Sequence, residues 1–424
     1  MDRFVIEGGD RLKGAVRISG SKNAVLPVLA ATVLKKGVYT IGNVPRLKDV
    51  DTMIRLLSVL GAKVKWVEPH RLKVDTRKLE NHVAPYELVK EMRASVLVLG
   101  SLMGRLKKAT VSYPGGCAIG ERPIDLHLKG LATLGCEVNI KEGYVEVTAK
   151  EMKGGRITFE TTTVGGTENI LMAAVLAKGE TIIENAAKEP EVVDLVAMLR
   201  KMGARIDGDG TEVLRINGVE ALTPCDHDVI PDRIETGTFL AACGITRGNI
   251  EIEECNPDHV KAIIDKFKEA GMEISEHGTT IKAAMNKKRP LAVDIKTAPY
   301  PGFPTDMQAQ TMAFMSISRG VSAITETIFE NRMMHAGELR RMGADIRVIG
   351  NTAIVKGGKI LSGTQVMATD LRASASLIVA GLASYGSTEI SEIYHIDRGY
   401  ETIEEKLSGL GAKITRRKGE DLES

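Results

Sequence analysis

The sequence lacks a charge excess of either sign, because 57 Lys and Arg residues nearly balance 55 Asp and Glu residues in a chain of 424. A net charge of +2 gives no general electrostatic reason to bind nucleic acid or a membrane surface. Aromatic residues are also scarce, at 4%, which disfavours the stacking platforms that bind single-stranded nucleic acid. We therefore expect neither a nucleic acid nor a membrane as a partner.

Features of secreted, membrane-bound and metal-dependent proteins are missing as well. No run approaches the roughly 18 apolar residues that cross a bilayer, and residues 1–4 do not begin a signal peptide. The five cysteines are odd in number and form no CxxC pair, which favours a reducing compartment. HExxH, DxDxDG and GxxxxGK(S/T) motifs are absent, and the eight histidines are scattered. The sequence predicts a cytoplasmic protein without a metal or another cofactor.

What the sequence does contain is a six-fold repeat. Each copy has a helix-like segment, then Leu/Met-Gly-Ala or a close variant, then an apolar-alternating run, as in LLSVLGAKVKW. The central glycines are separated by 74, 68, 68, 72 and 68 residues, an interval longer than that of common solenoid repeats. We predict that each glycine ends an amphipathic helix in the left-handed conformation, with a strand beginning next. These glycines are Gly61, Gly135, Gly203, Gly271, Gly343 and Gly411.

Each copy is predicted to be one α/β unit with the order helix, strand, helix, strand, strand, followed by a strand that leads into the next helix. The sixth copy stops after residue 417 without its second strand, and residues 4–14 resemble that missing piece as it occurs at 354–363. Three copies would form an N-terminal domain over residues 22–230, which carries Cys117. The others would form a C-terminal domain of residues 1–21 and 231–424, with a ligand cleft between the domains. One continuous repeat array is the alternative.

At two places in each copy, the residue type differs from one copy to the next although the flanking residues are similar. Both places lie near a predicted helix start. Free N–H groups and the dipole at a helix start attract anions. Arg suits bidentate contacts with phosphate or carboxylate, whereas Lys acts as a point charge. We therefore expect a strongly anionic ligand, although solvated surface charge is the alternative for any single residue. The candidates are Ser21–Asn23, Met92–Arg93, Gly166–Thr167, Asp232–Arg233, Thr305–Asp306 and Asp370–Arg372 at the first helix, and Lys48, Arg122, Glu189, His259, Arg332 and Arg398 before the second.

Cys117 is the candidate reactive group, because it lies in the glycine-rich loop Pro114–Gly120 with Arg122 close behind. Nearby cations or free N–H groups would lower the pKa of its thiol, and the glycine content suits a segment that changes shape. An unreactive surface cysteine is the alternative. Cys136 and Cys243 fall at apolar positions of the repeats, so we predict that both are core residues.

Long motifs in a fixed order give the chain a specific resemblance over nearly its whole length. These motifs are residues 20–24, 114–117, 122–127, 231–238, 303–310, 367–374 and 394–400. With them the chain resembles the UDP-N-acetylglucosamine 1-carboxyvinyltransferases, a family of enolpyruvyl transferases. The resemblance implies two inside-out α/β barrel domains, each of three repeated α/β units, which agrees with the repeat pattern.

The implied reaction moves the enolpyruvyl group of phosphoenolpyruvate to the 3′-hydroxyl of UDP-N-acetylglucosamine and releases phosphate, as the first committed step of peptidoglycan synthesis. Addition and elimination through a tetrahedral ketal need an acid and a base on opposite sides of the reacting centre. By resemblance, Cys117 is the proton donor and can carry a covalent adduct, Asp306 is the base at the sugar hydroxyl, and Asp370 takes part in the proton transfers. Fosfomycin, an epoxide phosphonate, would alkylate the thiol. No cofactor and no obligatory protein partner are implied.

The resemblance also implies a set of binding residues. Lys22, Arg122 and Arg398 match positions that grip the phosphate and carboxylate of phosphoenolpyruvate, and Lys22 and Arg398 count among the catalytic residues too. Asp306, Arg332 and Arg372 complete the expected substrate-binding set at the reacting centre. The positions that match the nucleotide-sugar site are Asn23, Arg93, Arg122, Pro123, Ile124, Asp125, Leu126, Thr163, Val164, Gly165 and Ile328.

One stretch departs from the family pattern. Gly166 stands where Ala is common and Glu168 where a neutral residue is common, which affects nucleotide contacts rather than the reaction. Two alternative functions stay open. A 5-enolpyruvylshikimate-3-phosphate synthase shares the fold and the donor, but it lacks the PGGCAIG loop. A non-catalytic anion-binding paralogue would not need Cys117 and Asp306 together.

Overall fold

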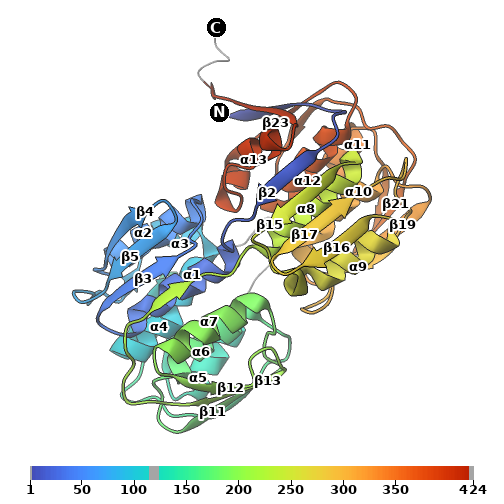
Figure 1. Cartoon of the computed structure of the whole chain (residues 1–424). Coiled ribbons are helices and arrows are strands. Elements are labelled where there is room, and N and C mark those ends of the chain that lie inside the picture. Colours follow the sequence, from blue (N-terminus) through green and yellow to red (C-terminus); the bar gives the residue numbers. More distant parts are fainter. Residues whose placement is uncertain (1, 114–123, 420–424) are drawn as a thin grey trace. The chain divides into compact units, whose positions relative to one another are not determined.

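The computed structural model describes residues 2–113 and 124–419, which form two compact units (Figure 1). The N-unit contains residues 20–113 and 124–230, and the C-unit contains residues 2–19 and 231–419. Within these residues, each unit has three four-stranded sheets, one for each copy of the repeat. The predicted order of helices and strands in a copy is confirmed, with the short helix α3 (Tyr86–Glu91) as an addition in the second copy.

The N-unit holds the first three copies. The first copy contains α1 (Lys22–Ala31), β3 (Val38–Gly42), α2 (Lys48–Val59), β4 (Lys63–Glu68) and β5 (Arg71–Asp75). The second contains β6 (Val83–Ala84), α4 (Val98–Leu106), β7 (Lys108–Ser112), α5 (Asp125–Thr133), β8 (Glu137–Lys141) and β9 (Tyr144–Thr148). The third contains β10 (Arg156–Thr158), α6 (Val164–Ala174), β11 (Glu180–Glu184), α7 (Pro190–Lys201), β12 (Arg205–Asp207) and β13 (Val213–Asn217), and β14 (Asp226–Asp228) follows.

The C-unit holds the other three copies and begins with β1 (Arg3–Glu7) and β2 (Lys13–Arg17). The fourth copy contains α8 (Arg233–Thr246), β15 (Asn249–Glu253), α9 (Lys261–Glu269), β16 (Glu273–His277) and β17 (Thr280–Ala284). The fifth contains β18 (Ile295–Lys296), α10 (Gln308–Met315), β19 (Val321–Thr325), α11 (His335–Arg341), β20 (Asp345–Ile349) and β21 (Thr352–Lys356). The sixth contains β22 (Gln365–Met367), α12 (Leu371–Ala383), β23 (Ser387–Ser391), α13 (Ile403–Gly409) and β24 (Lys413–Arg417).

The first helix of each copy lies in the interior of its unit. In the C-unit, α8, α10 and α12 contact one another (Figure 1) and are buried almost throughout. In the N-unit, α4 contacts both α1 and α6, and these helices are buried to a similar extent. A helix that is apolar on all sides belongs in a core. The second helices, such as α2 and α9, bury one face only. The first turn of each inner helix places polar groups at the end of the core.

Strands from distant parts of the chain complete three of the sheets. β1 lies between β23 and β24 and is antiparallel to both. β2, which precedes α1 in the chain, is parallel to β15 of the C-unit. β14, which precedes α8, is parallel to β3 of the N-unit. The chain therefore passes from one unit to the other after residue 19 and again after residue 230.

All six repeat glycines have positive φ angles, between 85° and 105°, so the predicted left-handed helix ends are confirmed. At Gly411 (φ 92°), no atom beyond the adjoining backbone lies within 4 Å of the place that a Cβ would take, and the same holds for Gly409 within α13. We expect Gly411→Ala to lower the free energy of unfolding by about 1–2 kcal/mol, because only the backbone conformation opposes the methyl group. Gly409→Ala is the matched control and should be neutral or slightly stabilising, since Ala favours helix. Urea unfolding measures both; equal effects would contradict the assignment of strain to Gly411.

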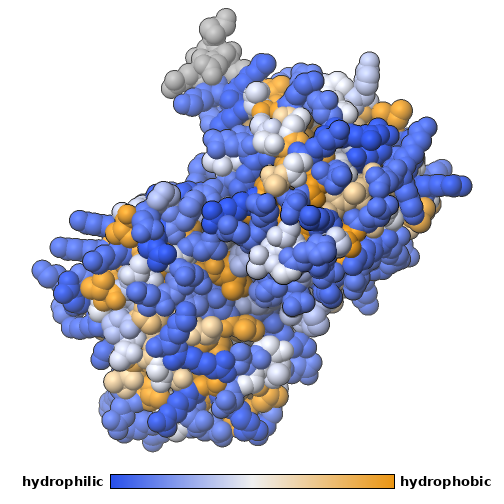
Figure 2. All heavy atoms as spheres, viewed as in Figure 1, coloured by the Kyte–Doolittle hydropathy of each residue, from blue (hydrophilic) through white to orange (hydrophobic). Residues whose placement is uncertain are grey.

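The described cysteines are all free thiols. The prediction that Cys136 and Cys243 are core residues is confirmed, because they are 7% and 0% exposed. Cys117 lies outside the described residues. Figure 2 shows mainly hydrophilic side chains on the visible surface, with hydrophobic ones in scattered groups. Within the described residues, the helices are all too short or too polar to cross a membrane.

Candidate active site

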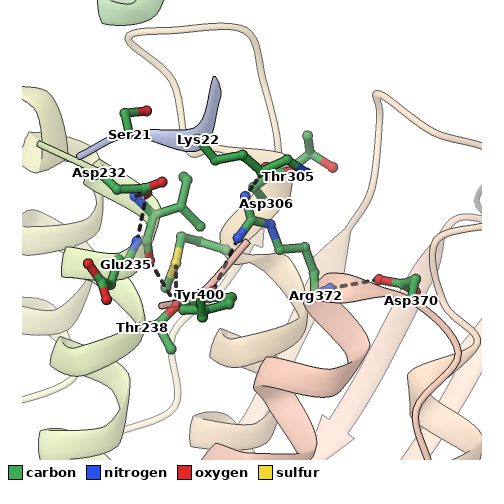
Figure 3. A network of polar contacts seen from close by, with 12 residues as sticks. Ser21, Lys22, Asp232, Glu235, Thr238, Thr305, Asp306, Asp370, Arg372 and Tyr400 are labelled. Carbon is green, nitrogen blue, oxygen red and sulfur yellow. Dashed lines mark hydrogen bonds and ion pairs between the residues drawn. The ribbon is translucent and has the colours of Figure 1, made fainter. Parts of the chain in front are cut away.

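An ion-paired cluster in the C-unit brings three predicted site residues together, namely Asp306, Arg332 and Arg372. Figure 3 labels Asp306 and Arg372 of this cluster. Asp306 lies in the 3-10 turn Thr305–Met307, directly before α10. Its carboxylate accepts a hydrogen bond from Arg332 at Oδ1 and from Arg372 at Oδ2, each at 2.7 Å. The two arginine side chains are about 95% buried, being 6% and 5% exposed, whereas Asp306 is 24% exposed. The Asp306 carboxylate is thus the member of this cluster that is most exposed to solvent.

The two arginines set the charge state of Asp306. Burial raises the pKa of this carboxyl, but the guanidinium groups of Arg372 and Arg332 outweigh burial and hold the pKa well below its usual range. Burial in turn lowers the pKa of Arg372, and the neighbouring Asp306 more than offsets this effect. Asp306 is therefore ionised at neutral pH, which is the form that a general base requires.

Asp370 caps α12, the helix that carries Arg372. Its Oδ1 accepts hydrogen bonds from the backbone N–H groups of Arg372 at 2.8 Å and Ala373 at 3.0 Å. This is the ordinary chemistry of a helix N-cap. His335 on α11 is buried, and burial lowers its pKa to about 4, with the charge of Asp370 opposing and that of Arg332 supporting this shift. Asp370 therefore has a structural role in the C-unit, whatever its part in proton transfer.

Ile328 is connected to the arginine cluster through Glu326. The backbone N–H of Ile328 donates to Glu326 Oε1 at 2.7 Å, and Thr305 donates to Glu326 Oε2 at 2.8 Å. Arg332 NH1 donates to the same Thr305 hydroxyl at 2.8 Å. Arg398 is the last residue of the 3-10 helix Ile393–Arg398. There, burial lowers the pKa of His395, and the positive charge of Arg398 lowers it further.

In the N-unit, Lys22 begins α1 directly after the cap residue Ser21, whose hydroxyl accepts from the N–H of Ala24. The ammonium group of Lys22 lies 2.8 Å from the Asp49 carboxylate in the first turn of α2. The side chain of Lys22 is 14% exposed and that of Asp49 is 5% exposed, so the lysine lies between the buried carboxylate and the surface. Asn23 follows Lys22 and is half-buried.

Two predicted nucleotide-sugar residues of the N-unit, Arg93 and Gly165, lie near His127 of α5. Burial lowers the pKa of His127 to about 4, and the charge of Arg93 adds to this effect. A side chain added at Gly165 would approach His127 to 3.2 Å, so these two residues lie in direct contact. Thr163 caps α6 by accepting from Gly166 N at 3.2 Å. The other predicted members are Val164, which is exposed in the first turn of α6, and Ile124, Asp125 and Leu126, which are buried, exposed and half-buried at the start of α5.

Three predicted site residues, Cys117, Arg122 and Pro123, lie outside the described residues. Glu168, the departure noted in the sequence, is only 3% exposed within α6. Burial raises the pKa of its carboxyl well above the usual range, and the charges of Glu191 and Glu189 raise it further. The side chain of Glu168 is therefore buried and is not part of the exposed first turn of α6.

Sequence reasoning missed the residues that hold the site residues in place. Asp49 beside Lys22 and Tyr400 beside Arg372 are both buried partners of predicted residues. The available signal was position, since Tyr400 is the last residue of the motif at 394–400 and Asp49 follows the candidate Lys48. In residues 2–113 and 124–419, no group of three or more His, Cys, Asp or Glu side chains is arranged to hold a metal ion.

Comparison with known proteins places the chain in one family. The family model of EPSP synthase (3-phosphoshikimate 1-carboxyvinyltransferase) matches residues 6–407. The UDP-N-acetylglucosamine 1-carboxyvinyltransferase of Geobacter metallireducens is 57% identical, over 98% of this chain and 99% of the relative. The protein of the same name from Cellvibrio japonicus is 54% identical, with the same coverage of 98% and 99%.

Two solved structures match nearly the full length of the chain. The enolpyruvyl transferase NikO from Streptomyces tendae has a TM-score of 0.89 at 26% identity and covers 98% of both chains. EPSP synthase from Acinetobacter baumannii has a TM-score of 0.78 at 17% identity and covers 99% of this chain and 100% of that one. The predicted enolpyruvyl transferase fold is thereby confirmed. The chain belongs to the enolpyruvyl transferases and, among them, to the UDP-N-acetylglucosamine 1-carboxyvinyltransferases.

Proposed function

We propose that the chain transfers the enolpyruvyl group of phosphoenolpyruvate to the 3′-hydroxyl of UDP-N-acetylglucosamine, releases phosphate, and so carries out the first committed step of peptidoglycan synthesis. The observation that carries this proposal is 57% identity, over nearly the full length of both chains, with an enzyme named for this reaction. The enzyme acts in the cytoplasm, which suits its free thiols. It needs no obligatory protein partner.

The reaction is an addition followed by an elimination. A proton is added to C3 of phosphoenolpyruvate, C2 becomes electron-poor, and the 3′-oxygen bonds to C2 as the hydroxyl proton leaves. The tetrahedral ketal then loses phosphate from C2 and a proton from C3, which restores the double bond. Cys117 donates the first proton, Asp306 accepts the hydroxyl proton and Asp370 takes part in these transfers. Arg372 and Arg332 keep the Asp306 carboxyl ionised, so its oxygens are available to accept a proton.

Cationic residues bind the anionic donor. Lys22, Arg122 and Arg398 bind its phosphate and carboxylate, and Arg332 and Arg372 add to the binding site at the reacting centre. Arg332 and Arg372 are buried, which supports this binding role, because guanidinium groups with little access to water bind carboxylates strongly. Asn23, Arg93, residues 122–126, residues 163–165 and Ile328 hold the nucleotide sugar. Neither a metal nor another cofactor takes part.

We assign residues 22–230 to an N-terminal domain and residues 1–21 with 231–424 to a C-terminal domain. The internal hydrogen bonding of the N-unit and the C-unit supports this division. In the C-unit, β1 pairs with two strands of the sixth copy. In the N-unit, β14 pairs with the first copy.

A phosphate-release assay tests the function and separates the alternatives. We expect phosphate from phosphoenolpyruvate only when UDP-N-acetylglucosamine is added, and none with shikimate-3-phosphate, the acceptor suggested by the name of the matching family model. Treatment with fosfomycin should stop release and add its mass to the peptide that contains Cys117. Release with shikimate-3-phosphate would favour the synthase, and none with either acceptor would favour a non-catalytic protein. Full activity after fosfomycin would contradict the role of Cys117.

A further inference from the structure

We propose that Tyr400 is a positioning residue of the transfer reaction, because its hydroxyl fixes the guanidinium group of Arg372 that pairs with Asp306. The inference rests on the proposed function, since it concerns the same cluster of the C-unit. Tyr400 is 2% exposed and would act through Arg372 without touching either substrate.

The hydroxyl of Tyr400 lies in a network of buried polar contacts (Figure 3). Arg372 NH1 and the amide nitrogen of Gln310 each lie 3.2 Å from the phenol oxygen. The Gln310 amide also lies 3.0 Å from the carbonyl oxygen of Asp306, which can only accept, so the nitrogen end faces the network. Since Arg372 can only donate, we assign the phenol hydrogen to Thr238 Oγ1 at 2.7 Å; the Gln310 amide nitrogen also lies 3.1 Å from this oxygen. Thr238 in turn donates to the carbonyl oxygen of Ile234 at 2.8 Å.

This network connects the three inner helices of the C-unit at their polar ends. Thr238 belongs to α8, Gln310 to α10 and Arg372 to α12, and Tyr400 follows the 3-10 helix Ile393–Arg398. With NH1 held by Tyr400, the NH2 group of Arg372 faces Asp306 Oδ2 at 2.7 Å. The arginine is buried, so water does not readily replace a lost partner. A small misplacement near a reacting centre can lower the rate by about 100-fold.

The hydroxyl also affects the proton affinity of Asp306, since it keeps one of two cations in place. Burial opposes ionisation of Asp306, and the arginines outweigh it. If Arg372 is held less firmly, the pKa of Asp306 rises, and a higher pH is needed to keep the base ionised. The acid limb of the pH–rate profile then moves to higher pH. The other charged or titratable groups that face the pair are Arg332 before α11, His335 on α11, Asp232 at the start of α8 and Asp370 at the start of α12.

The test compares Tyr400→Phe with Tyr39→Phe. Tyr39 is a buried tyrosine of the N-unit whose hydroxyl donates to the carbonyl oxygen of Lys35 at 2.9 Å, so it matches the loss of one buried hydroxyl. We expect Tyr400→Phe to lower kcat about tenfold or more and to move the acid limb to higher pH. The KM for UDP-N-acetylglucosamine should stay within about twofold. Tyr39→Phe should lower the melting temperature but leave kcat and the acid limb unchanged.

Thr238→Val gives a second, independent variant, because it removes the acceptor of the phenol hydrogen and keeps the shape of the side chain. It should lower kcat and move the acid limb in the same direction. The double variant should be little worse than Tyr400→Phe alone, because both residues act through one chain of contacts.

A folded Tyr400→Phe enzyme with unchanged kcat and an unchanged acid limb would overturn the inference while the proposed function stands. If Tyr400→Phe does not fold, the same two readouts on Thr238→Val decide. Failure of the unmodified chain to release phosphate would instead overturn the proposed function.

Discussion

Replacing Asp306 by Asn is expected to lower kcat by about 10²–10⁴-fold, the range that a positioned acid or base contributes. The amide is close to the carboxylate in shape, but it cannot accept the proton of the sugar hydroxyl. It also leaves Arg332 and Arg372 without the counter-ion that both contact at 2.7 Å. Removing one member of such a buried cluster costs about 3–5 kcal/mol of stability. The variant is therefore expected to be inactive and less stable, and the two effects have to be separated.

The pH dependence of stability separates them. The pKa of Asp306 is well below its usual range in the folded chain, so its ionised form stabilises the fold above the unfolded pKa. This contribution is lost as the pH falls through the folded pKa. The stability gap between the wild type and Asp306→Asn should thus be constant near neutral pH and shrink in strong acid, whereas the loss of turnover persists at every pH where both proteins are folded.

Asp194→Asn is the matched control for the loss of a buried carboxylate. Asp194 lies in α7 of the N-unit, its side chain is 4% exposed, and it is 3.0 Å from His227 Nε2. We expect a stability loss without a change in kcat. The measurements are urea unfolding and phosphate release under saturating substrates. A folded Asp306→Asn enzyme with kcat within tenfold of the wild type would mean that the base is another residue.

Much of the fold could be predicted because the repeat is encoded locally. The glycine that ends each second helix, such as Gly61 or Gly271, must adopt positive φ, and the alternating strands on its C-terminal side need one buried face. Such signals lie within about 20 residues of each other and recur six times. By contrast, the helix α3 had no usable signal, because an element this short carries too little periodicity.

The candidate site could be predicted only as a set of positions, not as a set of contacts. The repeat register selected Asp306, Arg332 and Arg372 separately, and nothing in it showed that both arginines pair with one carboxylate. These residues are 26 and 66 positions apart, a separation that a local pattern does not resolve. The roles of these residues, and that of Cys117, stay predictions.

The second large effect is expected on stability, at the buried ion pair of Lys406 and Glu235. The ammonium group lies 2.6 Å from Glu235 Oε1, and the side chains are 18% and 2% exposed. Lys406 also donates to Ser19 Oγ at 2.7 Å, and Glu235 Oε2 accepts from Ser19 N at 2.7 Å. Because Ser19 is the last residue of the C-unit before the chain enters the N-unit, the pair fixes this end of β2 and its connection to α8.

Lys406→Met is expected to lower the free energy of unfolding by about 3–5 kcal/mol, because Glu235 then keeps a buried charge without the ammonium group. Burial raises the pKa of Glu235, and Lys406 at present opposes that rise. Without the lysine the pKa rises further, so the variant's stability falls as the pH increases through the new value. The penalty should be largest at alkaline pH and shrink in mild acid, where Glu235 binds a proton.

Urea unfolding at several pH values measures this penalty, with Lys261→Met as the matched control in the same unit. Lys261 lies 2.9 Å from Glu276, but its side chain is 57% exposed, so solvent screens the pair and a much smaller loss is expected. An equal loss in both variants, or a Lys406→Met penalty that does not change with pH, would mean that Glu235 is not a buried charge that needs Lys406. A pH-dependent penalty confined to Lys406→Met would instead show that this ion pair stabilises the segment ending at Ser19, where the chain leaves the C-unit.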